Sequence, residues 1–553
     1  MNFYNRTVKY IIGLLMLVTS VSLKANNISV SNITLTGRDV SAGVNNAANF
    51  SMVQFNLSWE NSWRKSGQQA NWDAAWVFVK YRRYGGTWQH AWLNNTGHTA
   101  ASGSTIDVGL LTPGSAFNAS TNPGLGAFVY RSSVGSGSNS FTNMQLRWNY
   151  GAQSIPDSAV VDIQVFAIEM VYVPQGSFYV GSGSTETGSL TDGSWSSGAT
   201  IPFQITSEAA LGIDNAAGKL WGTSTSGNSS IGNSASDPEA TLSASYPKGY
   251  AAAYCMKYEI TQGQYLDFLN ALTYDQQASR TTAAPSSAPG TAALSNTNRN
   301  GLDIQISGNA TSLTSAVYAC NLDGDGLYNE AEDGMWIACN FISWMDGCAY
   351  LDWSGLRPMT ELEFEKFCRG NQTPVAAENA WGNSSATSVT SISNDGFINE
   401  TFSNTGANAN YNNVLSGPMR VGAFANANST RTLSGATYYG IMEMSSNLPE
   451  RVVSLGNAAG RSFTGIHGDG NLFTDGSSNV DFWPGINGNS TTSAANAAFG
   501  GTTGVTQAAG SGYRGGGFAS DITRLRISQR NGAGLTSISR GSPDGMRGVR
   551  SAP

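Results

Sequence analysis

The chain is poor in the side chains that redox centres use, and it lacks long apolar runs. It has three histidines and five cysteines among 553 residues, and the last cysteine is Cys368. Everything after that position lacks the thiolates that bind soft metals such as copper. Beyond the first residues, no stretch approaches the roughly 20 apolar residues that a transmembrane helix needs. We therefore expect no transmembrane segment.

Charged side chains are also scarce. Only 12% of the residues are charged, and the net charge is −7, so the sequence predicts no general attraction to nucleic acid. The basic residues are scattered, and Arg524, Arg526 and Arg530 form the nearest approach to a cluster. Two interpretations of this cluster are open, phosphate binding and ion pairing with nearby carboxylates, and ion pairing is favoured.

The first residues have the pattern of a secretory signal peptide, expected to span residues 1–25. Arg6 and Lys9 precede an apolar run at residues 11–18, and small residues follow up to Ala25. We expect cleavage near Ala25 and export to the periplasm, the cell surface or the medium. No cysteine comes directly after the expected cleavage site, so the pattern does not predict a lipid anchor.

Residues 27–168 form the first expected unit. Short segments alternate apolar and polar side chains, which predicts an antiparallel β-sandwich. The expected strands include residues 28–35, 52–59, 75–81 and 160–167. The unit is also rich in tryptophan, with Trp59, Trp63, Trp72, Trp76, Trp88 and Trp92. Indole rings stack on sugar rings or fill a core, and we favour the core.

Residues 169–553 form the second expected unit, which contains the best-defined helix start of the chain. Thr360 and Glu363 have the spacing of a capping box, and Gly370 supplies the helix stop. Similar signals predict helices over residues 261–272, 343–353 and 360–369. Polar, low-complexity insertions are expected near residues 183–245 and 279–311.

The string around Thr360 resembles a signature of the formylglycine-generating enzyme family, also called the sulfatase-modifying factors. Other strings resemble further motifs of that family, in the family's order. Together with the string around Thr360, which spans residues 349–365, they lie at residues 169–178, 257–265, 343–346, 439–450, 513–518 and 548–550. The resemblance implies a C-type-lectin-like fold for the second unit. The expected fold class is therefore α+β, an amino-terminal antiparallel β-sandwich followed by a loop-rich formylglycine-generating-enzyme-like domain.

The resemblance also implies a chemistry that this chain is not equipped to perform. Active members oxidise a substrate cysteine to formylglycine with two cysteines that hold copper, placed between the last two of these strings. That interval contains no cysteine here, and the histidine triad of related iron enzymes is missing, since His90 and His98 lie in the first unit and only His467 in the second. No catalytic residue is predicted.

Two functions remain open. The favoured one is a secreted, non-catalytic binding or surface protein whose partner is an extracellular ligand, protein or glycan. The alternative is a protein-modifying oxidoreductase of the formylglycine-generating type with a relocated active site. For the binding function, Arg514, Arg526 and Arg530 are predicted to line a polar groove near residues 447–450. Guanidinium groups there suit carboxylates, sulfates or sugar hydroxyls, unless the three arginines are buried and paired within the domain.

Residues 321–332 have the spacing of an EF-hand calcium loop. The predicted ligands are Asn321, Asp323, Asp325, the carbonyl of Leu327, Asn329 and Glu332. Gly326 makes the sharp turn at the sixth position. Runs of this kind also form plain turns, in which the side chains hydrogen-bond the backbone, but the completeness of the pattern favours calcium.

Two further predictions concern the neighbourhood of these motifs. The resemblance implies a second calcium site at Asn447 and Glu450, although Ser446 and Pro449 depart from the family's pattern between them. Cys320 and Cys339 bracket the calcium loop, and export would allow them to form a disulfide.

Overall fold

The computed structural model describes residues 27–553 except residues 68, 196–199, 225–230, 232–239, 427 and 486–503. The expected signal peptide lies outside the described residues. The expected α+β class is wrong, because the protein is rich in antiparallel sheet, with 31% of residues in strands and 10% in helices. The predicted helices do form, but each is short, and the polar segments between motifs add loops and small sheets rather than helices.

The first unit consists of long antiparallel strands. They are β1 (Ser29–Asp39), β2 (Phe50–Arg64), β3 (Asp73–Arg83), β4 (Gln89–His90), β5 (Ser104–Leu110), β6 (Gly124–Arg131), β7 (Gly135–Trp148) and β8 (Val161–Val173). β1, β2 and β7 form one sheet, while β8, β3, β6 and β5 lie side by side in another. The two sheets share a core in which inward side chains of β2 and β7 pack with those of β3 and β6, including Phe55, Val77, Val129 and Leu146.

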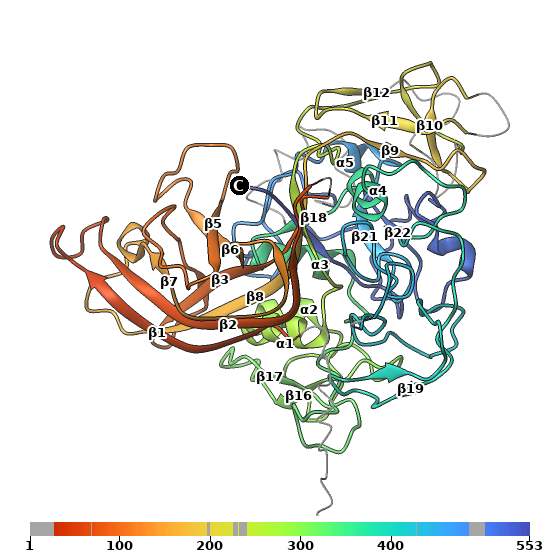
Figure 1. Ribbon diagram of the computed structural model, residues 1–553. Coiled ribbons are helices and arrows are strands. Elements are labelled where there is room, and N and C mark those ends of the chain that lie inside the picture. The colour runs from red at the N-terminus through yellow and green to blue at the C-terminus, as the bar shows by residue number, and fades with distance from the viewer. Residues whose placement is uncertain are drawn as a thin grey trace, which may run out of the picture.

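The second sheet does not end with the first unit (Figure 1). β8 runs through residues 168 and 169, where the sequence predicts the boundary between units. Beyond β8 the order continues through β15, β23 and β18, so strands of both units share one backbone hydrogen-bond ladder. Trp76 of β3 reinforces this junction. Its indole N–H donates to the carbonyl of Ser354 at 2.8 Å, and the guanidinium of Arg550 lies 4.5 Å from its ring centre.

The remaining strands are short and belong to the second unit. They are β9 (Phe178–Val180), β10 (Leu190–Asp192), β11 (Phe203–Ile205), β12 (Leu211–Ile213), β13 (Leu220–Gly222), β14 (Ala240–Leu242), β15 (Ala253–Met256), β16 (Leu302–Ile306), β17 (Val317–Cys320), β18 (Arg357–Pro358), β19 (Ile392–Ser393), β20 (Thr401–Phe402), β21 (Glu450–Val453), β22 (Ser511–Arg514) and β23 (Gly548–Ser551). The first predicted insertion contains the small sheet β10-β13-β12-β14 in its described part.

The three predicted helices are confirmed, and each begins at a capping box. The helices are α1 (Gln262–Asn270), α2 (Tyr274–Arg280), α3 (Trp344–Trp353), α4 (Glu361–Arg369) and α5 (Ala458–Arg461), with 3-10 turns η1 (Tyr150–Gln153) and η3 (Ile522–Leu525). Thr261, Ser343 and Thr360 are the N-cap residues of α1, α3 and α4. Over the described part of the chain, none of these helices has the length and apolar character needed to cross a bilayer.

Lys80 of β3 is a buried cation at the junction of the two units. Its side chain is 1% exposed, and its ammonium donates to the carbonyl of Gly470 at 2.6 Å. It also lies 5.2 Å from the ring centre of Trp353. Burial lowers the pKa of Lys80 to about 7, although Asp352 and Asp469 favour its charged form.

This shifted pKa predicts a pH dependence of stability. The folded protein releases the Lys80 proton near pH 7, whereas an unfolded chain holds it up to the ordinary value of 10.5. Between these values the unfolded chain binds more protons, so through this group the free energy of unfolding should rise by about 1.4 kcal/mol per pH unit. Urea denaturation at several pH values should show that the free energy of unfolding rises less steeply with pH for Lys80→Met than for the wild type. The exposed Lys65→Met should have the same slope as the wild type. Equal slopes for the wild type and Lys80→Met would contradict this assignment.

Candidate functional site

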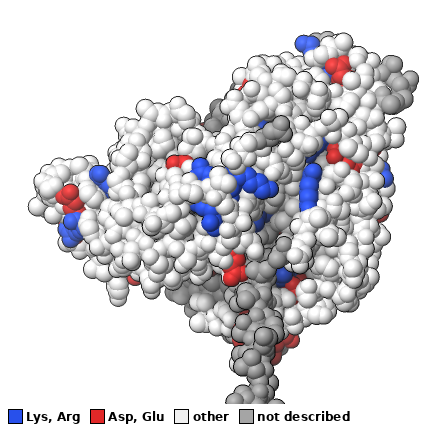
Figure 2. Space-filling model, viewed as in Figure 1, with Lys and Arg blue, Asp and Glu red and all other residues white. Residues whose placement is uncertain are grey.

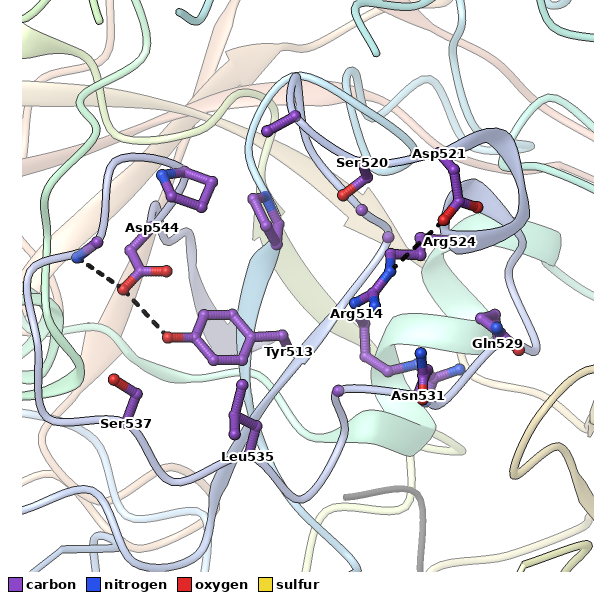
Figure 3. Close-up of a pocket in the computed structure, with 17 residues that line it drawn as sticks. Tyr513, Arg514, Ser520, Asp521, Arg524, Gln529, Asn531, Leu535, Ser537 and Asp544 are labelled. Atoms are coloured by element: carbon purple, nitrogen blue, oxygen red, sulfur yellow. Dashed lines mark hydrogen bonds and ion pairs between the residues drawn. The ribbon is translucent and has the colours of Figure 1, made fainter. Parts of the chain in front are cut away.

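A cavity of about 580 Å³ opens on the carboxy-terminal part of the second unit. Its volume lies within the range of small-ligand sites, roughly 300–1,000 Å³. The lining residues come from the start of β21, from the end of β22 and from the loops that follow β22 (Figure 3). They are Pro449, Tyr513, Arg514, Gly515, Gly516, Ala519, Ser520, Asp521, Arg524, Gln529, Asn531, Gly532, Leu535, Ser537, Gly541, Pro543 and Asp544. We call this the carboxy-terminal pocket.

Tyr513 gives the pocket an aromatic surface held in a fixed orientation. Its hydroxyl donates to Asp544 at 3.1 Å, and the backbone N–H of Gly541 donates to the same carboxylate oxygen at 3.0 Å. The guanidinium of Arg451 lies 4.1 Å from the Tyr513 ring centre and pairs with Asp544 at 3.0 Å. Because Arg451 is fully buried, it supports the ring from within the protein.

Beneath the pocket, two arginines share the carboxylates of α4. Arg514 pairs with Glu361 at 3.0 Å and with Glu365 at 2.8 Å. Arg530 pairs with Glu361 at 2.7 Å, and all of these side chains are buried. Burial would raise the pKa of Glu361, but the charges of Arg530 and Arg514 and their hydrogen bonds lower it overall. This network ties α4 to β22 and to the loop after η3.

The rim of the pocket is polar. Arg524 and Asp521 form an exposed pair at 3.8 Å, and the Asp521 side chain also caps η3. Ser520 accepts a hydrogen bond from the N–H of Gly517 at 3.0 Å. Gln529 is 9% exposed, and its side-chain oxygen has no hydrogen-bond partner among the described residues.

The three predicted ligand-binding arginines take different positions. Arg514 lines the pocket, but its charge is already engaged by Glu361 and Glu365. Arg530 is buried below and is not part of the lining. Arg526 is half-exposed outside the lining and makes a backbone bridge to Asn379. The alternative of buried, paired arginines therefore describes Arg514 and Arg530. Their pairing depends on α4, which lies far away in the sequence.

The described lining of the pocket offers the hydroxyls of Tyr513, Ser520 and Ser537 and the carboxylates of Asp521 and Asp544. No cysteine or histidine is among the described residues that line it. Its carboxylates are used structurally, since Asp544 holds Tyr513 and Asp521 caps η3. All five cysteines of the chain are buried free thiols, and burial raises the pKa of each of them. A buried, protonated thiol is a poor nucleophile and a poor metal ligand.

The structure describes Cys320 and Cys339 as free thiols, so it does not contain the predicted disulfide. Cys320 ends β17, and Cys339 lies in a loop segment whose N–H donates to the carbonyl of Ile260 beside α1. Both side chains pack into the apolar core of the second unit. Closeness in sequence does not set the directions of the Cβ atoms that a disulfide requires.

The predicted calcium loop is a tight turn in the structure. Asp323 accepts from the N–H of Asp325 at 3.2 Å, and Asp325 accepts from the N–H of Leu327 at 2.8 Å. Asn321 accepts from Gly326, and Asn329 accepts from the N–H of Cys320 at 2.9 Å. Over the described residues, no group of three or more His, Cys, Asp or Glu side chains is arranged to hold a metal ion. Calcium binding would require these side chains to turn toward the ion.

The same loop nevertheless carries uncompensated negative charge. Burial, and then the carboxylates of Asp325, Glu332 and Asp333, raise the pKa of Glu330. One oxygen of the buried Asp333 has no hydrogen-bond partner among the described residues. No ion pair of the described chain involves any of these carboxylates. The donor set therefore fits a divalent cation in charge and in ligand type.

The second predicted calcium pair fits an ion less well. Asn447 donates to Glu259 at 2.6 Å and accepts from the N–H of Met419 at 2.8 Å. Glu450 pairs with Arg547 at 2.5 Å, so a guanidinium already supplies the positive charge. A second carboxylate oxygen of Glu450 stays unpartnered among the described residues. We therefore derive no calcium site from Asn447 and Glu450.

Charge on the visible molecular face is sparse, as the composition predicts. Figure 2 shows a small group of basic side chains near the centre of that face and a few acidic ones, with most of the surface neither acidic nor basic. The visible face thus offers no continuous basic strip of the kind that binds a phosphate backbone.

Comparisons with known proteins leave the family of this chain undetermined. No protein-family model matches it, and no curated protein matches it. Among solved structures, PvdO from Pseudomonas aeruginosa is similar at 16% sequence identity with a TM-score of 0.30. That match covers 70% of this chain and 95% of PvdO. A likeness this weak carries no functional argument.

Proposed function

We propose that the protein is an exported, non-catalytic binding protein and that the carboxy-terminal pocket is its ligand site. The carrying observation is a cavity with a fixed aromatic surface and a polar rim but no cysteine or histidine among its described lining residues. Such a site can hold and orient a ligand, but its described lining offers neither a thiolate to bind copper nor a histidine to activate the hydroxyls of Ser520 and Ser537.

The resemblance to formylglycine-generating enzymes supports the position of this site. Most residues that line the carboxy-terminal pocket lie between the strings at residues 513–518 and 548–550, where active members of that family place their chemistry. In this chain the charge of Arg514 is turned inward, because Arg514 is paired with Glu361 and Glu365 of α4. The partner we propose is an extracellular protein or glycan with hydroxyl or amide groups for the polar rim.

A blocking substitution tests the pocket directly. Ala519 is an exposed lining residue, and Ala519→Trp should fill the cavity without disturbing the buried network. Selection of the purified protein against a glycan array and a displayed peptide library should yield ligands that Ala519→Trp no longer retains. Ala217→Trp, in the exposed turn between β12 and β13, is the matched control and should retain them. If no selected ligand distinguishes Ala519→Trp from Ala217→Trp, the carboxy-terminal pocket is not a binding site.

We also propose that calcium binds the loop of residues 321–332. Asn321, Asp323, Asp325, Asn329 and Glu332 would supply side-chain oxygens, with the carbonyl of Leu327, and the ion would offset their shared negative charge. Its role would be structural, because the loop sits at the end of β17 and away from the carboxy-terminal pocket in the chain.

Calcium should therefore raise the melting temperature of the protein after treatment with a chelator. A ligand at 100 times its Kd stabilises the folded state by about 2.7 kcal/mol, which differential scanning calorimetry detects easily. Asp325→Ala should abolish most of this shift. Asp475→Ala is the control, since Asp475 makes a similar turn hydrogen bond to the N–H of Ser477 outside the loop. If Asp325→Ala keeps the full calcium shift, the loop is only a turn.

A further inference from the structure

A second cavity lies at the junction of the two units, separate from the carboxy-terminal pocket. It encloses about 540 Å³. The first unit contributes the loop before β4, and the second contributes the end of α1, the start of α2, the end of α3 and the loop after Gly470. Its lining residues are Thr87, Trp88, Gln89, Ala271, Leu272, Thr273, Tyr274, Asp275, Gln276, Leu313, Trp353, Gly470, Asn471, Leu472 and Thr474. We call this the junction cavity.

Aromatic rings form part of its wall. Trp88 is half-buried, and the guanidinium of Arg82 lies 4.7 Å from its ring centre. Tyr274 and Trp353 are 8% and 5% exposed. Of the seven tryptophans in the first unit, Trp59, Trp76 and Trp148 are core residues at 1%, 0% and 2% exposure, which separates them from Trp88. Trp88 is the one of the seven in the described lining of the junction cavity.

One donor in this wall lacks a partner. The indole N–H of Trp353 is buried and makes no hydrogen bond among the described residues. The indole is held by edge contacts with Phe78 and Phe268, whose ring centres lie 5.1 and 5.5 Å away. A buried donor without an acceptor costs free energy, so a bound oxygen atom would stabilise this side chain.

The polar part of the wall is almost uncharged. The hydroxyls of Thr87 and Thr474 and the amides of Gln89 and Asn471 provide hydrogen-bonding groups, whereas the Gln276 amide is already bonded to Thr273 and Phe473. Asp275 is the one charged side chain among the described lining residues, and the nearby Arg82 over Trp88 is paired with Asp162 at 2.8 Å. Aromatic faces beside neutral hydrogen-bonding groups complement sugars, which present apolar C–H faces and hydroxyl edges.

We propose that the junction cavity is a binding site for a neutral oligosaccharide. Trp88 and Tyr274 supply the apolar contact surface, and Trp353 supplies a buried N–H donor for a hydroxyl or ring oxygen. Asp275 and Asn471 accept and donate hydrogen bonds at the exposed edge. The proposal does not depend on the function of the carboxy-terminal pocket, because the two cavities share no lining residue.

Calorimetric titration of the purified full chain tests this proposal. The probes are cellohexaose, xylohexaose, maltohexaose and chitohexaose, with a galacturonate hexamer as the anionic comparison. At least one neutral probe should bind with a Kd below about 1 mM and more tightly than the anionic probe. Trp88→Ala should weaken this binding about tenfold, whereas Trp88→Phe, which keeps an aromatic face, should stay close to the wild type.

Two further variants locate the binding. Thr474→Trp introduces a bulky ring at an exposed lining position and should block the cavity. Ala519→Trp blocks the carboxy-terminal pocket instead and should leave oligosaccharide affinity unchanged. The proposal is overturned if no neutral probe binds at about 1 mM, if the anionic probe binds best, or if Ala519→Trp abolishes binding while Trp88→Ala does not.

Discussion

Replacing Glu361 by glutamine is expected to cost about 3–5 kcal/mol of stability, because it leaves buried charge without its partner. The Glu361 carboxylate faces Arg514 and Arg530 and also accepts from the N–H of Leu455 at 2.8 Å. A neutral amide cannot balance two guanidinium groups that are shielded from water. Chemical denaturation should therefore show a markedly lower midpoint for Glu361→Gln.

Two comparisons show whether lost pairing is the cause. Asp162→Asn removes an exposed partner of Arg82, at 2.8 Å, and should cost no more than about 1 kcal/mol. The double variant Glu361→Met with Arg530→Met removes opposite charges together and should recover part of the loss. A cost below about 1 kcal/mol for Glu361→Gln would mean that the network contributes little to stability.

Trp76→Ala should cost about 3–5 kcal/mol and should weaken both units at once. Trp76 is fully buried, and its ring lies tilted against Phe128 of the first unit, with the ring centres 4.8 Å apart. Its hydrogen bond to Ser354 and its contact with Arg550 reach across to the second unit. Removing the indole leaves a cavity between them, which the surrounding strands can close only in part.

Hydrogen exchange locates the effect of this change. If the shared sheet makes the two units one cooperative body, amides of β15 and β23 should lose protection together with those of β3. Trp148→Ala is the control within the first unit, because Trp148 packs in the core between the two sheets of that unit and bonds Gln153. Unchanged exchange in β15 and β23 after Trp76→Ala would show that the units unfold independently.

Local sequence signals predict the helices well. Strand pairing is harder to predict, because it depends on residues far apart in the sequence. Capping boxes at Thr261, Ser343 and Thr360 act within four residues, so the sequence alone places these helix starts. The expected α+β class is wrong because the predicted helices are short and strands make up three times as much of the protein. Strand order depends on partners far apart in the sequence. β15 pairs with both β8 and β23, and no local pattern announces that arrangement.

The carboxy-terminal pocket also combines features that the sequence predicts with features that depend on long-range contacts. The sequence predicts a polar groove lined by Arg514, Arg526 and Arg530 near residues 447–450, and most of the carboxy-terminal pocket comes from the interval between the last two family-like strings. The roles of its arginines depend on carboxylates of α4, more than a hundred residues earlier, so the sequence could not separate Arg514 and Arg530 from Arg526. The junction cavity was not predicted, although Trp88 was among the tryptophans considered for sugar stacking.

We propose that this protein binds a ligand and does not make formylglycine, and a turnover assay tests this proposal most directly. The purified full chain is incubated with copper, oxygen and a sulfatase-type cysteine peptide, and the peptide mass is followed by mass spectrometry. We predict that the cysteine keeps its sulfur, because no thiol lies among the described residues of the pocket and burial raises the pKa of all five thiols. Catalytic loss of sulfur with formation of the aldehyde would contradict this account and would establish an enzyme with a relocated active site.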